Sequence, residues 1–264
     1  MKTWNCVKGM SSGPSGPSGP TSDLSTILKN RSMFCNKAKA DTEFVVTRFQ
    51  EDLAWTAGLE HLVTVYNKGS SNFDISGATI INVPNFGVGL ETVLRHIITR
   101  YDSLADTTMF CQGTLADRID QPMYPLEWYF DFAPAEDVKK GVKGVLTDSY
   151  DVPKSQYRFR LSSDSCKSVK NRNLREFREK VVGIPYKYLV EFWVRGDWIS
   201  VRRDAILKKP LDYYSYLYDA CQFGRGTFVE ECWFLERSLY SIFTQPVRLL
   251  FKYAVDSAKE VLIK

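Results

Sequence analysis

The 264-residue sequence lacks any hydrophobic run that approaches the roughly 18 residues needed to span a bilayer. Its first ten residues, MKTWNCVKGM, hold too few apolar side chains for a signal peptide. We therefore expect no transmembrane segment, and any membrane contact would be peripheral.

The sequence also lacks closely spaced cysteine pairs and has few histidines. The six cysteines include no CxxC pair, which favours reduced thiols over a disulfide framework or a zinc site. The only two histidines, His61 and His96, are expected to serve packing or surface hydrogen bonds rather than metal ligation. The sequence thus predicts a reducing compartment and offers no clear metal site.

A strong excess of one charge is missing as well. The net charge is +4 and the basic residues are dispersed, which is not typical of a dedicated nucleic-acid binder. A local basic stretch, Lys167–Lys180, is expected to be a solvated helix face. We predict no nucleic-acid partner.

The chain does contain enough apolar sequence for one sizeable domain, with 44% hydrophobic residues. Residues 11–20, SSGPSGPSGP, predict a flexible linker within a leader that covers residues 1–41. We expect a single domain over residues 42–264, with a nucleotide-sugar-binding half at 42–114 and an acceptor and catalytic half at 115–264.

The first half alternates between strand and helix patterns. Apolar runs predict strands at 43–49, 61–69, 78–85 and 107–113, with a short helix or turn after the first strand and an amphipathic helix at 89–104. Residues 114–182 are less regular and end in a charged helix at 173–182, and the tail predicts a helix at 247–263. This order indicates an open α/β sheet that binds ligands at the carboxyl ends of its strands.

Polar side chains follow each of these four strands. They could line a nucleotide crevice, with Arg48 or Lys68 near phosphate and Glu51 or Asp52 near a ribose or base. The full set is Arg48, Glu51, Asp52, Asn67, Lys68, Asn85 and Gln112. Ordinary turn chemistry is the alternative explanation. Gly87 and Gly89, just before the long helix, could also expose N–H groups to an anion, although the full dinucleotide fingerprint is absent.

A candidate base lies in the second half. The segment Phe228–Phe243 predicts an amphipathic helix that opens with Glu230 and Glu231. An inverting glycosyl transfer needs a carboxylate that takes the proton of the acceptor hydroxyl, and an aromatic neighbour such as Trp233 stacks sugar rings and raises the carboxyl pKa. We rank the candidates Glu231, Glu230 and then Glu236. Interaction with the helix dipole is the alternative for the first two.

The departing diphosphate needs positive charge. Gly196–Leu207 predicts a short strand that runs into a basic helix start, where Arg202 or Arg203 would meet the diphosphate. The position after the fourth strand, at which many nucleotide-sugar enzymes carry Asp-x-Asp, has Cys111-Gln112-Gly113-Thr114. Asp117 and Asp120 could hold a metal instead, so metal-dependent and metal-independent sites both stay open.

Several of these motifs together resemble a known family. The runs FVVTRFQEDLAW, VYNKG, VPNFGVGLETVLRHIITRYDSL and MFCQG look like domain-of-unknown-function proteins of fungi and large algal viruses, which are regarded as glycosyltransferase-like. The resemblance covers Glu43–Gly113 and Gly196–Phe243. It implies a GT-A-like mixed sheet flanked by helices, in which a Rossmann-like nucleotide-sugar half adjoins an acceptor half.

The later segment is also similar to the core-2 β-N-acetylglucosaminyltransferase and peptide O-xylosyltransferase family. Gly196-Asp197-Trp198 and Glu230-Glu231-Cys232-Trp233-Phe234 occupy the places of that family's Gly-x-x-Trp strand and Asp-Glu-x-x-aromatic helix. The resemblance implies a metal-independent inverting reaction with Glu231 as base and with Asp197, Trp198 and Trp233 on the substrate side. The chain departs from the pattern at Asp197 and Glu230, and it lacks the paired cysteines of that secreted family.

These resemblances imply an inverting transferase that moves xylose from UDP-xylose to a hydroxyl of a glycan. The acceptor would be a glycan of a viral capsid protein, and the place of action the host cytoplasm, as for a chlorella-virus enzyme. A non-catalytic glycan-binding or capsid-associated protein with the same fold is the alternative. A nucleotide-sugar hydrolase or a nucleotidyltransferase is the enzymatic alternative.

Overall fold

A computed structural model of the chain describes residues 42–114, 140–148, 174–185, 192–221, 223, 226, 227 and 229–246, with no account of the side chains of 144–148 and 192–197. The predicted leader at 1–41, the helix at 247–263 and the residues Asp117 and Asp120 lie outside this range.

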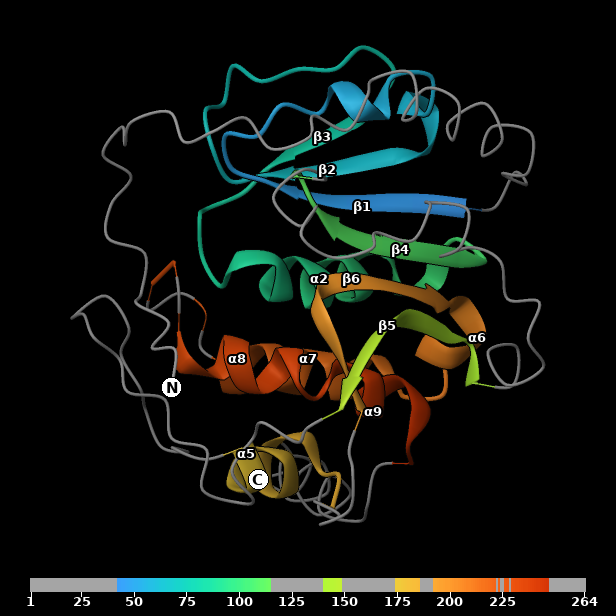
Figure 1. Cartoon of the computed structure of the whole chain (residues 1–264), viewed down its shortest axis with the longest axis vertical. Helices are drawn as coiled ribbons and strands as arrows, with labels where there is room; N and C mark the ends of the chain where they lie inside the picture. The colour runs from blue at the N-terminus through green and yellow to red at the C-terminus, as the bar shows by residue number, and fades with distance from the viewer. Residues whose placement is uncertain are drawn as a thin grey trace, which may run out of the picture.

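The centre of the molecule is a six-stranded sheet with the order β3-β2-β1-β4-β6-β5 (Figure 1). Four strands run parallel: β1 (Thr42–Arg48), β2 (Val63–Asn67), β3 (Thr79–Asn82) and β4 (Thr107–Gln112). β6 (Phe192–Arg202) is antiparallel to β4, and β5 (Val142–Asp148) is antiparallel to β6. This mixed sheet confirms the predicted α/β class and is consistent with a GT-A-like fold.

The register defines two edges of the sheet. Arg48 pairs with Asn67, Asn67 with Asn82, and Thr47 with Gln112, so the four parallel strands end together at what we call the carboxyl edge. Arg202 pairs with Thr107, the first residue of β4, so β6 ends at the opposite, amino edge. Figure 1 shows β6 running toward α6 at that edge.

Helices cover the two faces of the sheet unequally. On one face α2 (Val88–Arg100) packs against β1 and β4. On the same side α7 (Leu211–Cys221) packs against α2, α8 (Glu230–Glu236) against α2 and β6, and α9 (Leu239–Thr244) against β6. The other face carries the short 3-10 turns η1 (Ala54–Thr56) and η2 (Glu60–Leu62). The remaining elements are η3 (Tyr101–Ser103), α5 (Leu174–Glu176), the π-helical η6 (Phe177–Val182) and α6 (Arg203–Ile206).

Each face has its own hydrophobic core. Val45 of β1 points into the larger core with Leu94 and Ile97 of α2, whereas Phe44 and Val46 point into the smaller core with Trp55. A strand that is buried on both faces reads as a continuous apolar run, which is why β1 was predictable from sequence.

Several predicted boundaries change. The strand expected at 61–69 begins at Val63 because Glu60–Leu62 form η2. The single helix expected at 228–243 is two helices, α8 and α9. The charged helix at 173–182 is a short α5 followed by η6, and α7 and β5 were not predicted. Among the described helices, none has the length and apolar character to cross a membrane.

Candidate functional site

The loop that follows β1 is held at the carboxyl edge by several hydrogen bonds. The Arg48 guanidinium donates to the Glu51 backbone oxygen and to Asn67 Oδ1, both at 2.9 Å, and lies 3.5 Å from the centre of the Phe73 ring. The Glu51 carboxylate in turn accepts from the backbone N–H groups of Phe49 at 2.6 Å and Gln50 at 3.1 Å. The predicted residues Arg48, Glu51 and Asn67 are therefore brought together.

Two glycines let neighbouring loops approach this one. A Cβ on Gly69 would lie 1.5 Å from the Phe49 backbone oxygen, and a Cβ on Gly113 would lie 2.9 Å from the Glu51 Cβ. Trp55 Nε1 donates to the Gly113 oxygen at 3.0 Å. The ends of β1, β2 and β4 thus form one polar cluster.

Other side chains of this cluster differ in exposure. Asp52 is exposed and accepts from the Ala54 N–H at 2.9 Å, and Gln112 is half-buried at the end of β4. Phe49, directly after β1, was not predicted from the sequence, and its side chain is 45% exposed. Because Phe49 is apolar and adjoins β1, the sequence pattern includes it in the strand. Only its position one residue after the strand end could have indicated an exposed ring.

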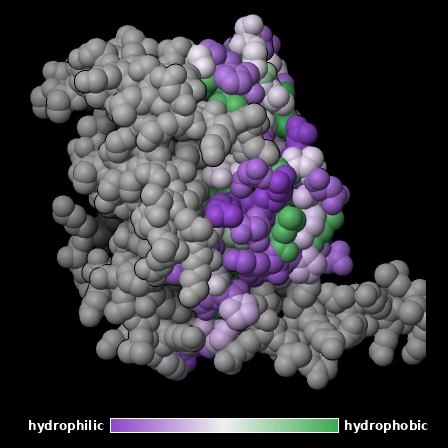
Figure 2. Space-filling model, turned by 90° about the vertical axis from the view of Figure 1, so that its right-hand side faces the viewer, coloured by the Kyte–Doolittle hydropathy of each residue, from purple (hydrophilic) through white to green (hydrophobic). Residues whose placement is uncertain are grey.

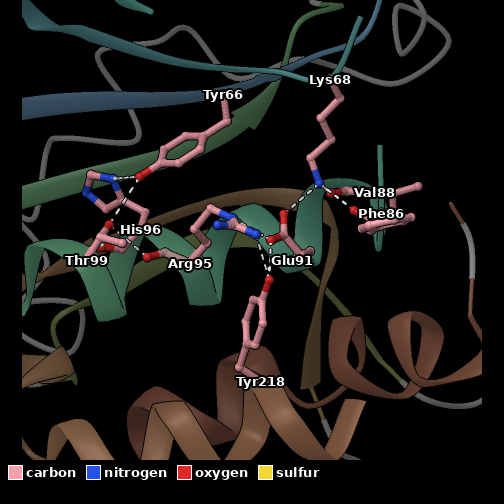
Figure 3. A network of polar contacts seen from close by, with 9 residues as sticks. All are labelled: Tyr66, Lys68, Phe86, Val88, Glu91, Arg95, His96, Thr99 and Tyr218. Carbon is pink, nitrogen blue, oxygen red and sulfur yellow. Dashed lines mark hydrogen bonds and ion pairs between the residues drawn. The ribbon is translucent and has the colours of Figure 1, made fainter. Parts of the chain in front are cut away.

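Lys68 has a different place from the one predicted beside a phosphate. Its side chain is 1% exposed, and its amine donates to the oxygens of Phe86 at 2.5 Å and Val88 at 2.7 Å and to Glu91 Oε2 at 2.8 Å (Figure 3). Burial lowers the pKa of Lys68, although the Glu91 carboxylate opposes this shift. An ammonium with three hydrogen bonds to protein acceptors has no donor left for a ligand.

The Lys68 contact continues into a network that joins β2, α2 and α7. Glu91 Oε1 accepts from Arg95 Nε at 2.5 Å and from the Tyr218 hydroxyl at 2.7 Å, and Arg95 also donates to the Tyr218 oxygen at 2.7 Å. Burial and the adjacent Glu91 carboxylate raise the pKa of Tyr218 to about 12. Removing either Lys68 or Glu91 alone should lower the free energy of unfolding by about 3–5 kcal/mol, because the remaining buried charge loses its partner.

The turn into α2 has an unusual backbone. Gly87 and Val88 have φ angles of 60° and 45°, in the left-handed region. A β-branched residue rarely adopts this region, and the strain is about 1–2 kcal/mol. The turn also closes on Phe223, since a Cβ on Gly87 would lie 2.4 Å from its ring.

The same turn is tied to the segment before α8. The N–H groups of Gly87 and Val88 donate to the oxygens of Gly226 at 3.3 Å and Thr227 at 3.2 Å. These two N–H groups are therefore occupied, and the anion cradle expected around Gly87 and Gly89 does not form from them. The contact does place the start of α8 beside the start of α2, at the carboxyl edge (Figure 1).

The predicted carboxylates lie in α8. Glu230 and Glu231 occupy its first turn and are 1% and 4% exposed. Cys232, the next residue, is close enough to Lys68 to interact with it electrostatically. Glu236 lies at the end of the helix and pairs with Arg237 at 3.5 Å.

The tryptophans predicted on the substrate side do not lie together. Trp233 of α8 is half-buried, with the Arg237 guanidinium 5.2 Å from its ring centre. Trp198 of β6 is buried in the smaller core on the other face of the sheet, beside Trp55 and Met109. Asp197 precedes it in β6, and its side chain lies outside the described part.

Arg202 and Arg203 lie at the amino edge rather than beside the crevice. Arg202 Nε is 3.2 Å from Asp204 Oδ1, and Arg203 donates to the Leu104 oxygen at 3.0 Å and pairs with Asp106. Figure 2 faces this side of the molecule, and the surface drawn in colour is largely hydrophilic with scattered apolar residues. The two arginines thus belong to surface ion pairs across the sheet from Arg48.

The two histidines lie in different surroundings. His96 is buried, with Nδ1 3.3 Å from the Tyr66 hydroxyl and Nε2 3.5 Å from Glu43 Oε2, and His61 is exposed in η2. Burial raises the pKa of Glu43, but the hydrogen bond and charge of His96 outweigh it and leave this pKa below its usual value. The described residues contain no cluster of three or more His, Cys, Asp or Glu side chains suited to a metal.

Comparison with protein-family models, curated proteins and solved structures gives no match. The function therefore has to be argued from the carboxyl edge itself. Of the sequence-predicted residues, this edge gathers Arg48, Glu51, Asp52, Asn67, Asn85 and Gln112, with Glu230 and Glu231 on the adjoining helix.

Proposed function

We propose that the chain is an inverting glycosyltransferase that uses a UDP-sugar. The observation that carries this proposal is the cluster at the carboxyl edge, where the loop after β1 meets Asn67 of β2 and Gly113 after β4. Doubly wound sheets bind nucleotides in the crevice at this edge. The hydrogen bonds within this loop support the same role, because a preformed site loses less entropy when the ligand binds.

The donor nucleotide would lie over the loop after β1. The exposed Phe49 ring would stack on the base, and the exposed Asp52 carboxylate would accept hydrogen bonds from ribose hydroxyls. Arg48 is the predicted cation that remains at this edge, since the amine of Lys68 is occupied by protein acceptors and Arg202 and Arg203 lie at the other edge. Its guanidinium would interact with the diphosphate.

The reaction would use a carboxylate of α8. An acceptor hydroxyl oxygen attacks C1 of the sugar while the bond from C1 to the diphosphate oxygen breaks, and Glu231 takes the hydroxyl proton. The hydrogen bonds between Gly226–Thr227 and the turn into α2 support this role, because they bring the start of α8 to the same edge as the donor loop. UDP-xylose is the donor to test first, with a glycan hydroxyl as acceptor.

The test is a panel of UDP- and GDP-sugars incubated with the full chain, with and without EDTA. We expect one UDP-sugar to raise the melting temperature and to release UDP when a glycan acceptor is added. The EDTA arm decides whether a metal takes part. Release without acceptor would indicate a nucleotide-sugar hydrolase instead.

Glu231→Gln tests the base. General-base catalysis contributes about 10²–10⁴-fold, so this variant should lose transfer by that factor and still bind UDP. Glu236→Gln, at the other end of the same helix, is the matched control and should keep most activity. If no nucleotide sugar binds the wild type, the transferase proposal fails and the non-catalytic glycan-binding protein is the remaining reading.

A further inference from the structure

We propose that the turn Pro84–Val88 is a carbohydrate-binding element, on which the Phe86 ring and the Asn85 amide hold a pyranose ring of the acceptor glycan. Lys68 is the positioning residue that keeps this turn in its binding shape. The assignment of this sugar to the acceptor rests on the proposed function, but binding of a sugar ring to this turn can be tested without it.

The first support is the strained backbone. Val88 has a φ of 45°, directly after Gly87 at 60°. Strained residues of this kind are concentrated at ligand-binding sites, where the surroundings hold them in place. The turn into α2 is the only place among the described residues where a non-glycine residue has a positive φ.

The second support is the way the turn is held. The buried Lys68 amine donates to the oxygens on both sides of Gly87, those of Phe86 and Val88 (Figure 3). Glu91 fixes the amine from the third side at 2.8 Å. Because these contacts use the backbone of the turn, the side chains of Asn85 and Phe86 are not needed to hold it.

The third support is what the turn presents. The Phe86 side chain is 36% exposed, one of three large apolar side chains with this much exposure in the described part of the chain. Asn85 beside it is half-buried, and the described residues provide no hydrogen-bond partner for its amide. An aromatic ring that stacks on the apolar face of a sugar, next to an amide that bonds its hydroxyls, is a suitable combination for a neutral pyranose.

The position of the turn favours the acceptor over the donor. Its N–H groups bond Gly226 and Thr227, and α8 begins three residues after Thr227 with Glu230 and Glu231. The donor loop after β1 has its own exposed ring, Phe49. A sugar on Phe86 would therefore lie beside the segment that leads into the proposed base.

The experiment measures binding of a set of methyl pyranosides to the full chain by saturation-transfer NMR, together with UDP binding by calorimetry. We expect the wild type to bind at least one glycoside. Phe86→Ala and Asn85→Ala should each weaken that binding about 10-fold, in line with the loss of one stacking or hydrogen-bonding contact. Phe86→Tyr should retain it, and Leu207→Ala, at an exposed apolar side chain of the amino edge, should leave glycoside binding unchanged.

The positioning role of Lys68 needs a variant that still folds. Lys68→Met alone leaves Glu91 without its buried partner, so the double variant Lys68→Met, Glu91→Leu removes both charges of this pair, while Arg95 keeps its hydrogen bond to the Tyr218 oxygen. We expect this variant to fold and to bind glycosides about 10-fold more weakly, with the loss in acceptor KM rather than in donor binding. A purely structural pair would leave the glycoside affinity of the folded variant unchanged, which would overturn the positioning role.

The outcomes separate this inference from the proposed function. If no glycoside binds the wild type, or if Phe86→Ala binds as well as the wild type, the inference is overturned whether or not UDP binds. If UDP-sugars fail to bind but glycoside binding depends on Phe86, the inference stands and the transferase proposal falls. If transfer proceeds with an unchanged acceptor KM in Phe86→Ala and Asn85→Ala, the acceptor assignment is overturned while the transferase proposal stands.

Discussion

Lys68 and Lys209 are both buried, but their amines have very different surroundings. The Lys68 amine has three acceptors, one of them a carboxylate. The Lys209 backbone is held by the Tyr101 hydroxyl at 2.5 Å and by the Ile206 oxygen at 3.2 Å, yet its amine has no ion pair among the described residues. Burial, with a smaller contribution from Lys208, lowers the pKa of Lys209 to about 8.

We predict that Lys209→Met stabilises the protein at pH 7 by roughly 2 kcal/mol, and by less at pH 10. The pKa of Lys209 is about 8 in the folded chain, against 10.5 for an ordinary lysine. Below pH 8 the folded state carries the full cost of a buried charge. Between pH 8 and pH 10.5 the unfolded state binds more protons than the folded state. The free energy of unfolding of the wild type therefore rises with pH, and the stabilisation by Lys209→Met becomes smaller.

Urea unfolding at the two pH values measures this effect. Lys208→Met is the control, because Lys208 is exposed and its replacement should change stability by no more than about 0.5 kcal/mol at either pH. An equal effect of Lys209→Met at pH 7 and pH 10 would contradict the prediction.

Single residues were predictable where their role follows from strand ends. Arg48 and Asn67 stand at the boundary between an apolar run and a turn, and the parallel register brings them within 2.9 Å of each other. The role of Lys68 was not predictable in the same way. Its partners come from a turn and a helix about 20 residues further along the chain, and no local pattern shows that they close over its amine.

At the scale of elements, glycine decides how closely the loops at the carboxyl edge approach. Gly69 packs directly on the Phe49 backbone oxygen, at 1.5 Å from where a Cβ would lie. Gly77, by contrast, has a φ of +92° in an exposed turn, where a Cβ would lie 3.3 Å from the Glu60 Cβ. The first glycine is needed for a contact between two loops, and the second only for its own backbone angle.

We predict that Gly69→Ala destabilises the protein by roughly 3 kcal/mol or more, because backbone atoms rather than a flexible side chain must move. Gly77→Ala should cost only about 1–2 kcal/mol, the usual strain of a left-handed alanine. Denaturant unfolding of both variants gives the comparison. Equal losses, or a larger loss for Gly77→Ala, would mean that the loops after β1 and β2 are not packed against each other as described.

Elements were predictable from sequence where their apolar pattern was continuous. β1, β4 and α2 were expected within a few residues of their observed bounds. The break between α8 and α9 was not, since the apolar stripe continues across it. There Ser238 donates its hydroxyl to the Phe234 oxygen at 2.6 Å and ends the first helix. α7 was missed because half of its buried face is tyrosine, Tyr213 and Tyr214 beside Leu217 and Cys221, and tyrosine is common on exposed surfaces as well.

At the scale of the whole molecule, the direction of β6 decides which charges meet. The sequence shows a strand that ends in Arg202, but a strand pattern carries no sign of direction relative to its neighbours. A parallel β6 would have brought Arg202 to the carboxyl edge beside Arg48. Because β6 is antiparallel to β4, Arg202 lies opposite Thr107 instead, and the two arginines mark opposite edges of the sheet.

This separation gives a test of where the nucleotide binds. We predict that Arg48→Ala weakens UDP binding by roughly 10-fold or more, the loss of one charge-assisted contact, and that it reduces the dependence of binding on salt. Arg202→Ala removes an equal charge at the amino edge and should leave UDP affinity unchanged. Calorimetric titration of the two variants at low and high ionic strength measures both effects. Because both variants lower the net charge by one, equal losses would indicate a general field effect, whereas a loss confined to Arg202→Ala would move the binding site to the amino edge.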